Sequence, residues 1–211
     1  MKVKTLKEKA YDEIRRLILR GELKAGEFLT ENSLVERLKM SRTPIRAAIE
    51  RLDADGHLTY IPNRGIFVSE MTIDKVIDFY DFRMAIESHV VKKLAARPLQ
   101  ADEIAWFRDN LRRQNECIAA KDNHAFTVED SAFHRQLTAI YGNKEILLTM
   151  ERLQDKLYRI ALNVLQKDSD RVQVSYEDHV SIFENILEGK VEDAADRMTQ
   201  HLEFGKRILV Y

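Results

Sequence analysis

Apolar residues recur every three to four positions along most of the chain, which is the spacing of amphipathic helices. In residues 1–70 this spacing predicts three helices: Ala10–Arg20, Glu31–Leu38, and a stretch from Ser41 to a stop at Asp55-Gly56. A short extended piece, Glu27–Leu29, lies between the first two helices. Only Lys39 and Met40 connect the second and third helices, the length that a helix-turn-helix requires. Two β-like runs, Leu58–Ile61 and Ile66–Val68, then predict a hairpin. The pattern therefore predicts a winged helix-turn-helix.

Residues 71–211 follow the helical period throughout. They contain three glycines, one proline and no strand-like alternation of useful length. Breaks at Pro98, Gly142-Asn143 and Gly189 help to divide the stretch. The predicted helices are Thr72–Ala96, Ala101–Lys121, Asn123–Tyr141, Asn143–Leu165, Asp170–Glu188 and Lys190–Val210. The core stripe predicted for the first of them is Ile73, Ile77, Tyr80, Met84, Val91 and Leu94. We therefore expect a mainly α protein, with a winged unit at 1–70 and an all-helical bundle of about six helices at 71–211.

The third helix of the winged unit has two different faces. Its apolar stripe consists of Ile45, Ala48, Ile49 and Leu52. Arg42 and Arg46, four residues apart, share the opposite face, and Thr43 lies beside them in the first turn. Ser41 stands where its hydroxyl is expected to cap the helix. Guanidinium groups suit guanine edges and phosphates, so this face predicts a recognition helix for the major groove of DNA.

The predicted hairpin has a basic tip, Pro62-Asn63-Arg64-Gly65. Arg64 is expected to reach backbone phosphate or the minor groove from this wing. Taken alone, the third helix could equally be an ordinary amphipathic surface helix. The ordered succession of two helices, a short turn, a basic helix and a glycine-tipped hairpin favours DNA binding over that alternative.

Charge and composition agree with this division of the chain. The formal net charge is −1, but residues 1–70 hold 14 Lys and Arg against 11 Asp and Glu, while residues 71–211 hold 20 against 24. The positive part is the part with the basic helix. The single cysteine, Cys117, cannot form an internal disulfide, which fits a reducing cytoplasm. No apolar run reaches the length of a membrane span.

Three histidines and one aspartate lie at positions that are expected to face the bundle interior, on three different predicted helices. Asp130 and His134 are four residues apart and share a helix face, whereas His179 and His201 lie on the last two helices. A helical bundle can bring such side chains together in its interior. Imidazole and carboxylate suit divalent zinc, nickel, manganese or iron. On the residues alone, separate burial of each histidine as a satisfied core residue stays open.

Three segments of the winged unit resemble the DNA-binding domain of GntR-type bacterial transcriptional regulators. They are Leu29-Thr30-Glu31, Ser41-Arg42-Thr43-Pro44-Ile45-Arg46 and Gly56-His57-Leu58, within a match over about Lys7–Val68. The resemblance implies DNA contacts by Ser41, Arg42, Thr43 and Arg46, and a wing contact by Arg64 and Gly65. Asn32 stands where relatives often carry Arg, and Ala47 where they often carry Glu.

The bundle resembles the all-helical effector domain, called FCD, of the FadR-type branch of these regulators. The resemblance rests on Asp130-Ser131-Ala132-Phe133-His134, Glu177-Asp178-His179 with Ile182, and Met198-Thr199-Gln200-His201-Leu202. It implies that Asp130, His134, His179 and His201 bind a divalent metal whose remaining positions take water or an organic acid. Arg83, in a stretch with Glu87 that also matches the family, is expected either to meet a carboxylate of that acid or to form a surface or interhelix salt bridge.

These observations predict a transcriptional repressor in the cytoplasm, controlled by a small carboxylate-bearing metabolite bound at the metal. A homodimer would place two recognition helices on a palindromic operator in double-stranded DNA. The alternative is a metal-dependent hydrolase or another metalloenzyme, because a metal with open positions can activate water. Against it, we find neither a His-Glu-x-x-His motif nor an obvious general base beside the ligands, so we expect no enzymatic activity.

Overall fold

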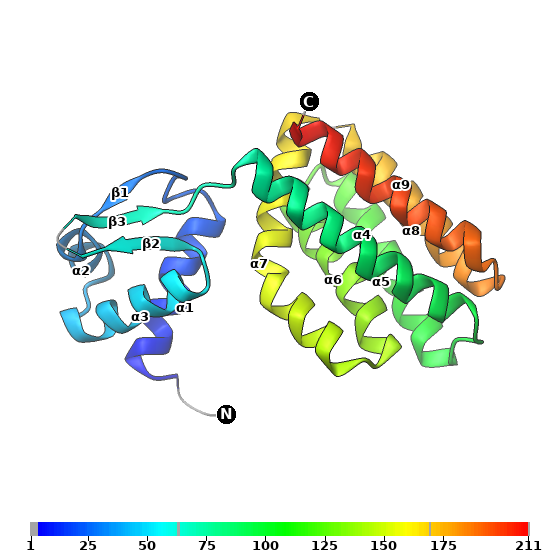
Figure 1. The fold of residues 1–211 in the computed structure, drawn as a ribbon, viewed down its shortest axis with the longest axis horizontal. Helices are drawn as coiled ribbons and strands as arrows, with labels where there is room; N and C mark the ends of the chain where they lie inside the picture. The colour runs from blue at the N-terminus through cyan, green and yellow to red at the C-terminus, as the bar shows by residue number, and fades with distance from the viewer. Residues whose placement is uncertain (1–3, 63, 169, 211) are drawn as a thin grey trace. The chain divides into compact units, whose positions relative to one another are not determined.

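The computed structural model describes residues 4–62, 64–168 and 170–210. The chain forms two compact units, Met1–Met71 and Thr72–Tyr211 (Figure 1). Each unit has its own buried core, and each is described by itself below. Asn63, in the predicted hairpin tip, lies outside the described residues.

The first unit is a three-helix unit with a small sheet. Its elements are α1 (Leu6–Leu19), β1 (Phe28–Leu29), α2 (Glu31–Leu38), α3 (Arg42–Ala54), β2 (Leu58–Ile61) and β3 (Gly65–Val68). The strands are antiparallel in the order β1-β3-β2, with β3 paired to both neighbours. The hairpin of β2 and β3 is the wing, so the observed order of elements is that of the predicted winged helix-turn-helix.

Capping explains where the helices begin. Thr5 and Glu8 form a reciprocal capping box, so α1 starts at Leu6, four residues before the predicted start. Thr30 caps α2 by accepting a hydrogen bond of 3.0 Å from the Ser33 N–H. The expected cap at Ser41 is wrong in one respect. Ser41 is the N-cap residue of α3, but its side chain makes no capping hydrogen bond.

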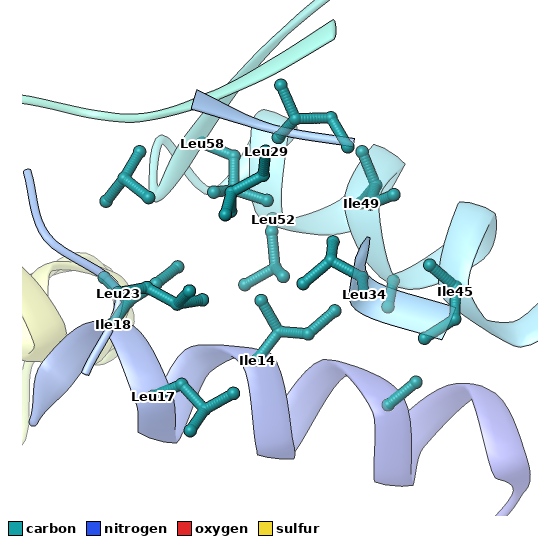
Figure 2. Close-up of a cluster of buried hydrophobic side chains, with 14 residues drawn as sticks. Ile14, Leu17, Ile18, Leu23, Leu29, Leu34, Ile45, Ile49, Leu52 and Leu58 are labelled. Carbon is teal, nitrogen blue, oxygen red and sulfur yellow. The ribbon is translucent and has the colours of Figure 1, made fainter. Parts of the chain in front are cut away.

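The core of the first unit lies between the three helices and the sheet (Figure 2). It is built from aliphatic side chains of every element, among them Ile14, Leu17, Leu34, Ile45, Ile49, Leu52, Leu58 and Ile66. All four residues of the predicted α3 stripe are at most 2% exposed. Burial of this stripe fixes which side of α3 faces outward, because the two faces belong to one rigid helix.

The second unit is a bundle of six helices. They are α4 (Ile73–Ala95), α5 (Ala101–Ala119), α6 (Asn123–Tyr141), α7 (Lys144–Lys167), α8 (Arg171–Leu187) and α9 (Val191–Val210), each within two residues of its predicted bounds. Helix α4 packs along α9, α5 packs on α6 and α8, and α6 packs on α7 (Figure 1). None of the helices in the described residues is long and apolar enough to span a membrane.

The inner face of α4 differs from the predicted stripe. Ile73 is 54% exposed and Ile77 and Met84 are only partly buried, whereas Arg83 and Glu87 are buried. The prediction assumed that the inward face of α4 would be apolar. The middle of α4 instead turns two charged residues toward the centre of the bundle, where polar side chains of other helices meet them.

Candidate nucleic-acid interface and metal centre

The polar face of α3 carries the predicted DNA-contacting residues in exposed positions. Ser41, Arg42, Thr43 and Arg46 are all exposed, whereas Pro44 and Ile45 between them are buried. This is the arrangement a recognition helix needs, because the base-reading side chains must reach beyond the helix surface.

Both arginines on this face have partners at the start of α2. The Arg42 guanidinium donates to the Asn32 side-chain oxygen at 3.2 Å. The Arg46 Nε donates to the Glu31 carboxylate, at 2.8 Å from one oxygen and 3.0 Å from the other. The carboxylate raises the pKa of Arg46 above its usual value, so the guanidinium stays charged. The sequence had not indicated that Glu31 and Asn32 would hold the two arginines.

The wing depends on a glycine at the start of β3. Gly65 has φ = +109°, and a Cβ there would lie 2.3 Å from the Phe28 ring of β1. Phe28 itself packs on Phe67 with ring centroids 5.3 Å apart. Gly65 therefore lets the wing pack closely on β1, while the exposed Arg64 beside it extends from the tip. Arg64 donates its backbone N–H to the Ile61 carbonyl at 3.0 Å, and its side chain is exposed.

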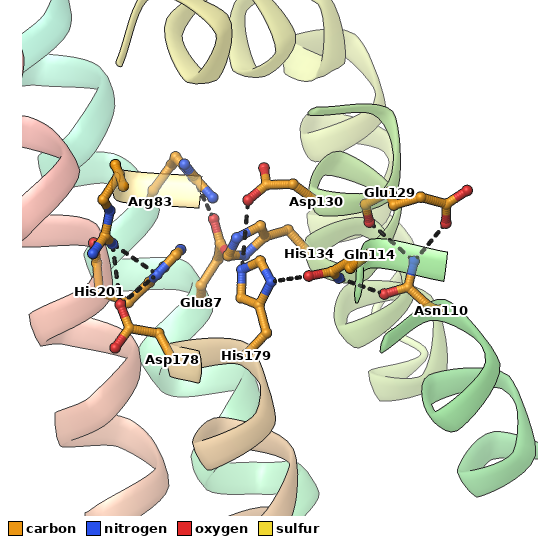
Figure 3. A network of polar contacts seen from close by, with 11 residues as sticks. Arg83, Glu87, Asn110, Gln114, Glu129, Asp130, His134, Asp178, His179 and His201 are labelled. Atoms are coloured by element: carbon orange, nitrogen blue, oxygen red, sulfur yellow. Dashed lines mark hydrogen bonds and ion pairs between the residues drawn. The ribbon is translucent and has the colours of Figure 1, made fainter. Parts of the chain in front are cut away.

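Asp130, His134, His179 and His201 come together inside the bundle, as the sequence predicted. One ligand atom from each lies within 4.8 Å of all the others. The residues come from α6, α8 and α9, and the three histidines are at most 6% exposed (Figure 3). Such a group of one carboxylate and three imidazoles is a donor set for a divalent transition metal.

A residue outside this group orients each of the three imidazoles through Nδ1. The pairs are His134 with Glu87 at 2.5 Å, His179 with Gln114 at 2.8 Å, and His201 with Asp178 at 3.1 Å (Figure 3). Nδ1 of His201 also lies 3.1 Å from Nη2 of Arg171, which can only donate, so its partners leave the tautomer of that ring open. In His134 and His179 the carboxylate or amide oxygen can only accept, so Nδ1 carries the proton and donates. Nε2 then holds a lone pair, as in metal-binding histidines with an outer carboxylate or carbonyl partner.

A chain of amides fixes the orientation of Gln114. Asn110 donates from its side-chain nitrogen to the Glu129 carbonyl at 3.0 Å and carboxylate at 2.8 Å, both of which can only accept. The Asn110 oxygen must then accept from the Gln114 nitrogen, at 2.7 Å. Consequently the Gln114 oxygen faces His179, and the protonation assigned to that ring follows from the network.

The inner nitrogens of two rings are buried without partners. Nε2 of His134 and Nε2 of His179 have no hydrogen bond within the described part of the chain. The Asp130 carboxylate is the nearest acid to His179, at 3.5 Å from Nε2, too far for a good hydrogen bond. Buried polar atoms are rarely left unsatisfied, so these residues fit a bound metal ion.

Burial keeps His179 and His201 neutral, which is the form that binds metal. It lowers the pKa of His179 well below its usual value, and the neighbouring His201 and His134 add to that effect. Burial also lowers the pKa of His201 to about 4, although the hydrogen bond to Asp178 opposes it. Burial alone would raise the pKa of Glu87, but Arg83 and His134 lower it to about 2, so Glu87 stays ionised.

A small cavity of about 30 Å³ adjoins the cluster. Asp130, His134 and His201 line it together with Arg83, and Tyr80 lies on the same wall. Arg83 forms a buried ion pair with Glu87 at 2.6 Å, and this salt bridge lies within α4 rather than at the surface or between helices. Its Nη2 is nevertheless buried without a partner among the described residues. Arg83 therefore has a donor left for a ligand beside the candidate metal ligands.

The sequence did not identify the residues that hold the ligands in place. Gln114 and Asn110 come from α5, a helix that supplies no ligand, and nothing in their spacing marked them. Asp178 directly precedes His179 in α8 yet pairs with His201 of α9. Glu87 and Asp178 carried a signal, because both lie in stretches that resemble the FCD family.

Family models match both units of the chain. The model described as bacterial regulatory proteins of the gntR family matches residues 6–68, and the FCD domain model matches residues 78–204. Together these matches cover most of both units.

Known relatives cover nearly the whole chain. The Nta operon transcriptional regulator of Aminobacter aminovorans is 30% identical over 84% of this chain and 82% of its own length. The HTH-type transcriptional repressor RspR of Escherichia coli K12 is 28% identical over 93% of this chain and 85% of its own. The gluconate operon transcriptional repressor of Bacillus licheniformis is 26% identical over 82% of this chain and 69% of its own length.

Solved structures share the fold. A GntR transcriptional regulator from Rhodococcus sp. RHA1 superposes with a TM-score of 0.79 at 22% identity, covering 96% of this chain and 97% of its own. Escherichia coli McbR/YncC superposes with a TM-score of 0.79 at 18% sequence identity, covering 98% of this chain and 98% of its own. The family and the relatives are regulators, which decides against the metalloenzyme considered from the sequence. The chain belongs to the gntR family of bacterial regulatory proteins, in the branch with an FCD domain, and is a DNA-binding transcriptional regulator.

Proposed function

We propose that this regulator is a repressor whose DNA binding is controlled by a small organic acid held at a metal in the FCD domain. The observation that carries the proposal is the pair of buried, unpartnered Nε2 atoms beside a cavity with an open Arg83 donor. Two relatives are named as repressors, one of them of a gluconate operon, which supports repression.

The metal would be held by Asp130, His134, His179 and His201. Bound there, it would supply a Lewis-acid position for a carboxylate oxygen. Zinc, nickel, manganese and iron all accept this donor set. Arg83 would donate to the same carboxylate, and Glu87 would keep both Arg83 and His134 in position. An acid that binds one arrangement of the DNA-binding units better than another would shift their equilibrium.

DNA contact would come from α3 and the wing. Arg42, Thr43 and Arg46 would meet base edges and phosphates, Ser41 a phosphate at the helix start, and Arg64 with Gly65 the backbone or the minor groove. Binding would require Arg46 to exchange the Glu31 carboxylate for DNA. A homodimer in the cytoplasm would present two such surfaces to a palindromic operator.

An electrophoretic shift assay with genomic fragments tests the DNA-binding part. We expect Arg42→Ala with Arg46→Ala to weaken specific binding by about 100-fold or more, because each good base contact is worth about 1–3 kcal/mol. The matched control is Arg20→Ala, which removes an exposed arginine just after α1. It should change affinity by less than about threefold, apart from a small salt-dependent effect. Equal loss in both variants would contradict the assignment of α3 as the reading helix.

A further inference from the structure

A second arginine lines the cavity, and the proposed function does not use it. Arg171 is the first residue of α8, is 2% exposed, and borders the same cavity as Arg83. A guanidinium is always charged and carries five donors. A buried one therefore needs several acceptors, and the partners of Arg171 show which of its donors remain open.

One side of the Arg171 guanidinium is firmly held. Its Nη2 donates to the Asp178 carboxylate at 3.1 Å and to the His201 carbonyl at 3.0 Å. Its central carbon lies 4.4 Å from the centre of the Phe204 ring. These contacts fix the position of the group before any ligand arrives.

The other side is open. Nη1 of Arg171 is buried without a hydrogen-bond partner in the described residues, as is Nη2 of Arg83. A buried unsatisfied donor on a charged group is costly, so a ligand acceptor at each of these atoms would be favourable. The cavity wall thus offers two fixed cationic donors, one on α4 and one on α8.

The charges around the cavity require the metal before the anion. Two buried arginines, Arg83 and Arg171, face three carboxylates, those of Glu87, Asp130 and Asp178, which leaves one negative charge in excess. A divalent metal reverses the excess to one positive charge. Arg197, which pairs with Asp178 at 3.3 Å, adds a further positive charge, but it is 43% exposed and largely screened. The metal-loaded centre therefore has one buried positive charge in excess, which favours an anionic ligand.

We propose that Arg171 forms a second anion-binding position, so that the effector is a small dicarboxylic acid rather than a monocarboxylic one. This rests on the proposed function: one carboxylate occupies the metal and Arg83, and the other accepts from Nη1 of Arg171. A dianion gives both open donors an acceptor, whereas a monoanion bound at the metal and Arg83 leaves Arg171 with an unmade bond.

Calorimetric titration of the zinc-loaded, full-length protein tests this with matched acids of equal chain length. The pairs are malonate with propionate, succinate with butyrate, and glutarate with valerate. In the wild type, at least one diacid should bind about tenfold or more tightly than its monoacid partner. Arg171→Gln should reduce that ratio to less than about three while leaving the monoacid affinity within about threefold.

Arg197→Gln is the matched control. It removes the other arginine that pairs with Asp178 but leaves the cavity donors in place, so the diacid preference should persist. Zinc content and thermal unfolding of each variant are measured alongside. If Arg171→Gln does not fold, Arg171→Lys keeps the charge, and the wild-type ratio itself remains decisive.

The outcomes separate this inference from the proposed function. Equal affinity for diacids and monoacids in the wild type, or an undiminished preference in folded Arg171→Gln, overturns the role of Arg171 and leaves the acid-responsive site intact. If no acid of either series binds the zinc-loaded wild type at concentrations up to about 10 mM, a very weak limit, both ideas fail.

Discussion

At the scale of single residues, the outer partners of the histidines differ in what they do for folding. Glu87 and Asp178 each neutralise a buried arginine as well as orienting a ring. Removing either would leave an uncompensated buried charge, which costs about 3–5 kcal/mol, so a lost metal site could not be separated from a damaged fold. Gln114 is neutral, so its role toward His179 can be tested without that complication.

Gln114→Leu should lower zinc affinity by about 10- to 100-fold, the usual effect of losing a partner behind a metal-binding histidine. Leucine has a similar volume but cannot accept the Nδ1–H of His179, so the ring loses its fixed tautomer and orientation. Competition against a chelator of known affinity measures the change. Gln173→Leu, which alters an exposed glutamine paired with Glu177 in α8, should leave zinc affinity unchanged. Unaltered affinity in Gln114→Leu would mean that the amide only fills space.

The two N-caps around the helix-turn-helix should respond differently to alanine. Thr30→Ala removes a hydrogen bond to the Ser33 N–H and should cost about 1 kcal/mol of local stability. Ser41→Ala removes no capping bond and should cost less than about 0.5 kcal/mol, while weakening DNA binding if the hydroxyl meets a phosphate. Hydrogen exchange of the α2 and α3 amides, with DNA affinity measured in parallel, distinguishes the two effects. A comparable loss of protection in both variants would contradict this distinction.

Sequence reasoning found the candidate metal ligands but not the groups that position them. The four candidate ligands share inward-facing positions at helical spacing, so the pattern reveals them. Their partners depend on which helices become neighbours and how far each is rotated, which spacing along one helix does not encode. Asp178 shows this, because its neighbour in sequence is His179 but its hydrogen-bond partner is His201.

At the scale of elements, the packing of the wing on β1 leaves no room for a side chain at Gly65, because the backbone there lies against the Phe28 ring. Gly65 starts β3 at φ = +109°, and the Phe28 ring of β1 occupies the space that a side chain would need. Two penalties thus meet at one position, an unfavourable backbone angle and a steric clash. Gly21 offers a comparison, since its φ is +70° but nothing lies within 4 Å of its would-be Cβ.

Gly65→Ala should therefore destabilise the first unit by at least about 2 kcal/mol, and Gly21→Ala by about 1 kcal/mol. Adding Phe28→Ala should recover part of the loss in Gly65→Ala, because the ring clash is removed, but none of the loss in Gly21→Ala. Exchange protection of the α3 amides reports the free energies. If the destabilisations caused by Gly65→Ala and Phe28→Ala simply add in the double variant, the Phe28 ring does not clash with a side chain at position 65.

Element boundaries were more predictable than element faces. The bundle helices have clear stops such as Gly142 and Gly189, both with positive φ, so the sequence states where they end. The buried face of α4 was less accessible to pattern reasoning, because Arg83 and Glu87 are hydrophilic and point inward only by virtue of each other and His134. The stripe prediction assumed that buried helix faces are apolar, and the candidate metal centre is an exception to that assumption.

At the scale of the whole molecule, the chain has two compact units, one of which contains the candidate metal site. All four candidate metal ligands belong to the unit Thr72–Tyr211, whereas α3 belongs to Met1–Met71. A ligand stabilises the part of the chain that it binds, according to its concentration and affinity. The single tryptophan, Trp106, lies in α5 and packs on Phe107 with ring centroids 5.3 Å apart, so its fluorescence reports unfolding of the bundle alone.

Zinc at about 100 times its dissociation constant should stabilise the bundle by about 2.7 kcal/mol, which corresponds to a rise of about 5–10 °C in the transition followed by Trp106 fluorescence. A chelator should reverse the rise, and His201→Ala should abolish it. Exchange protection of the α3 amides should stay the same in the absence of an acid, because metal alone contacts no residue of the first unit. If zinc protects α3 as strongly as the bundle, the two units unfold as one cooperative body, and control of DNA binding would then begin with the metal rather than with the acid.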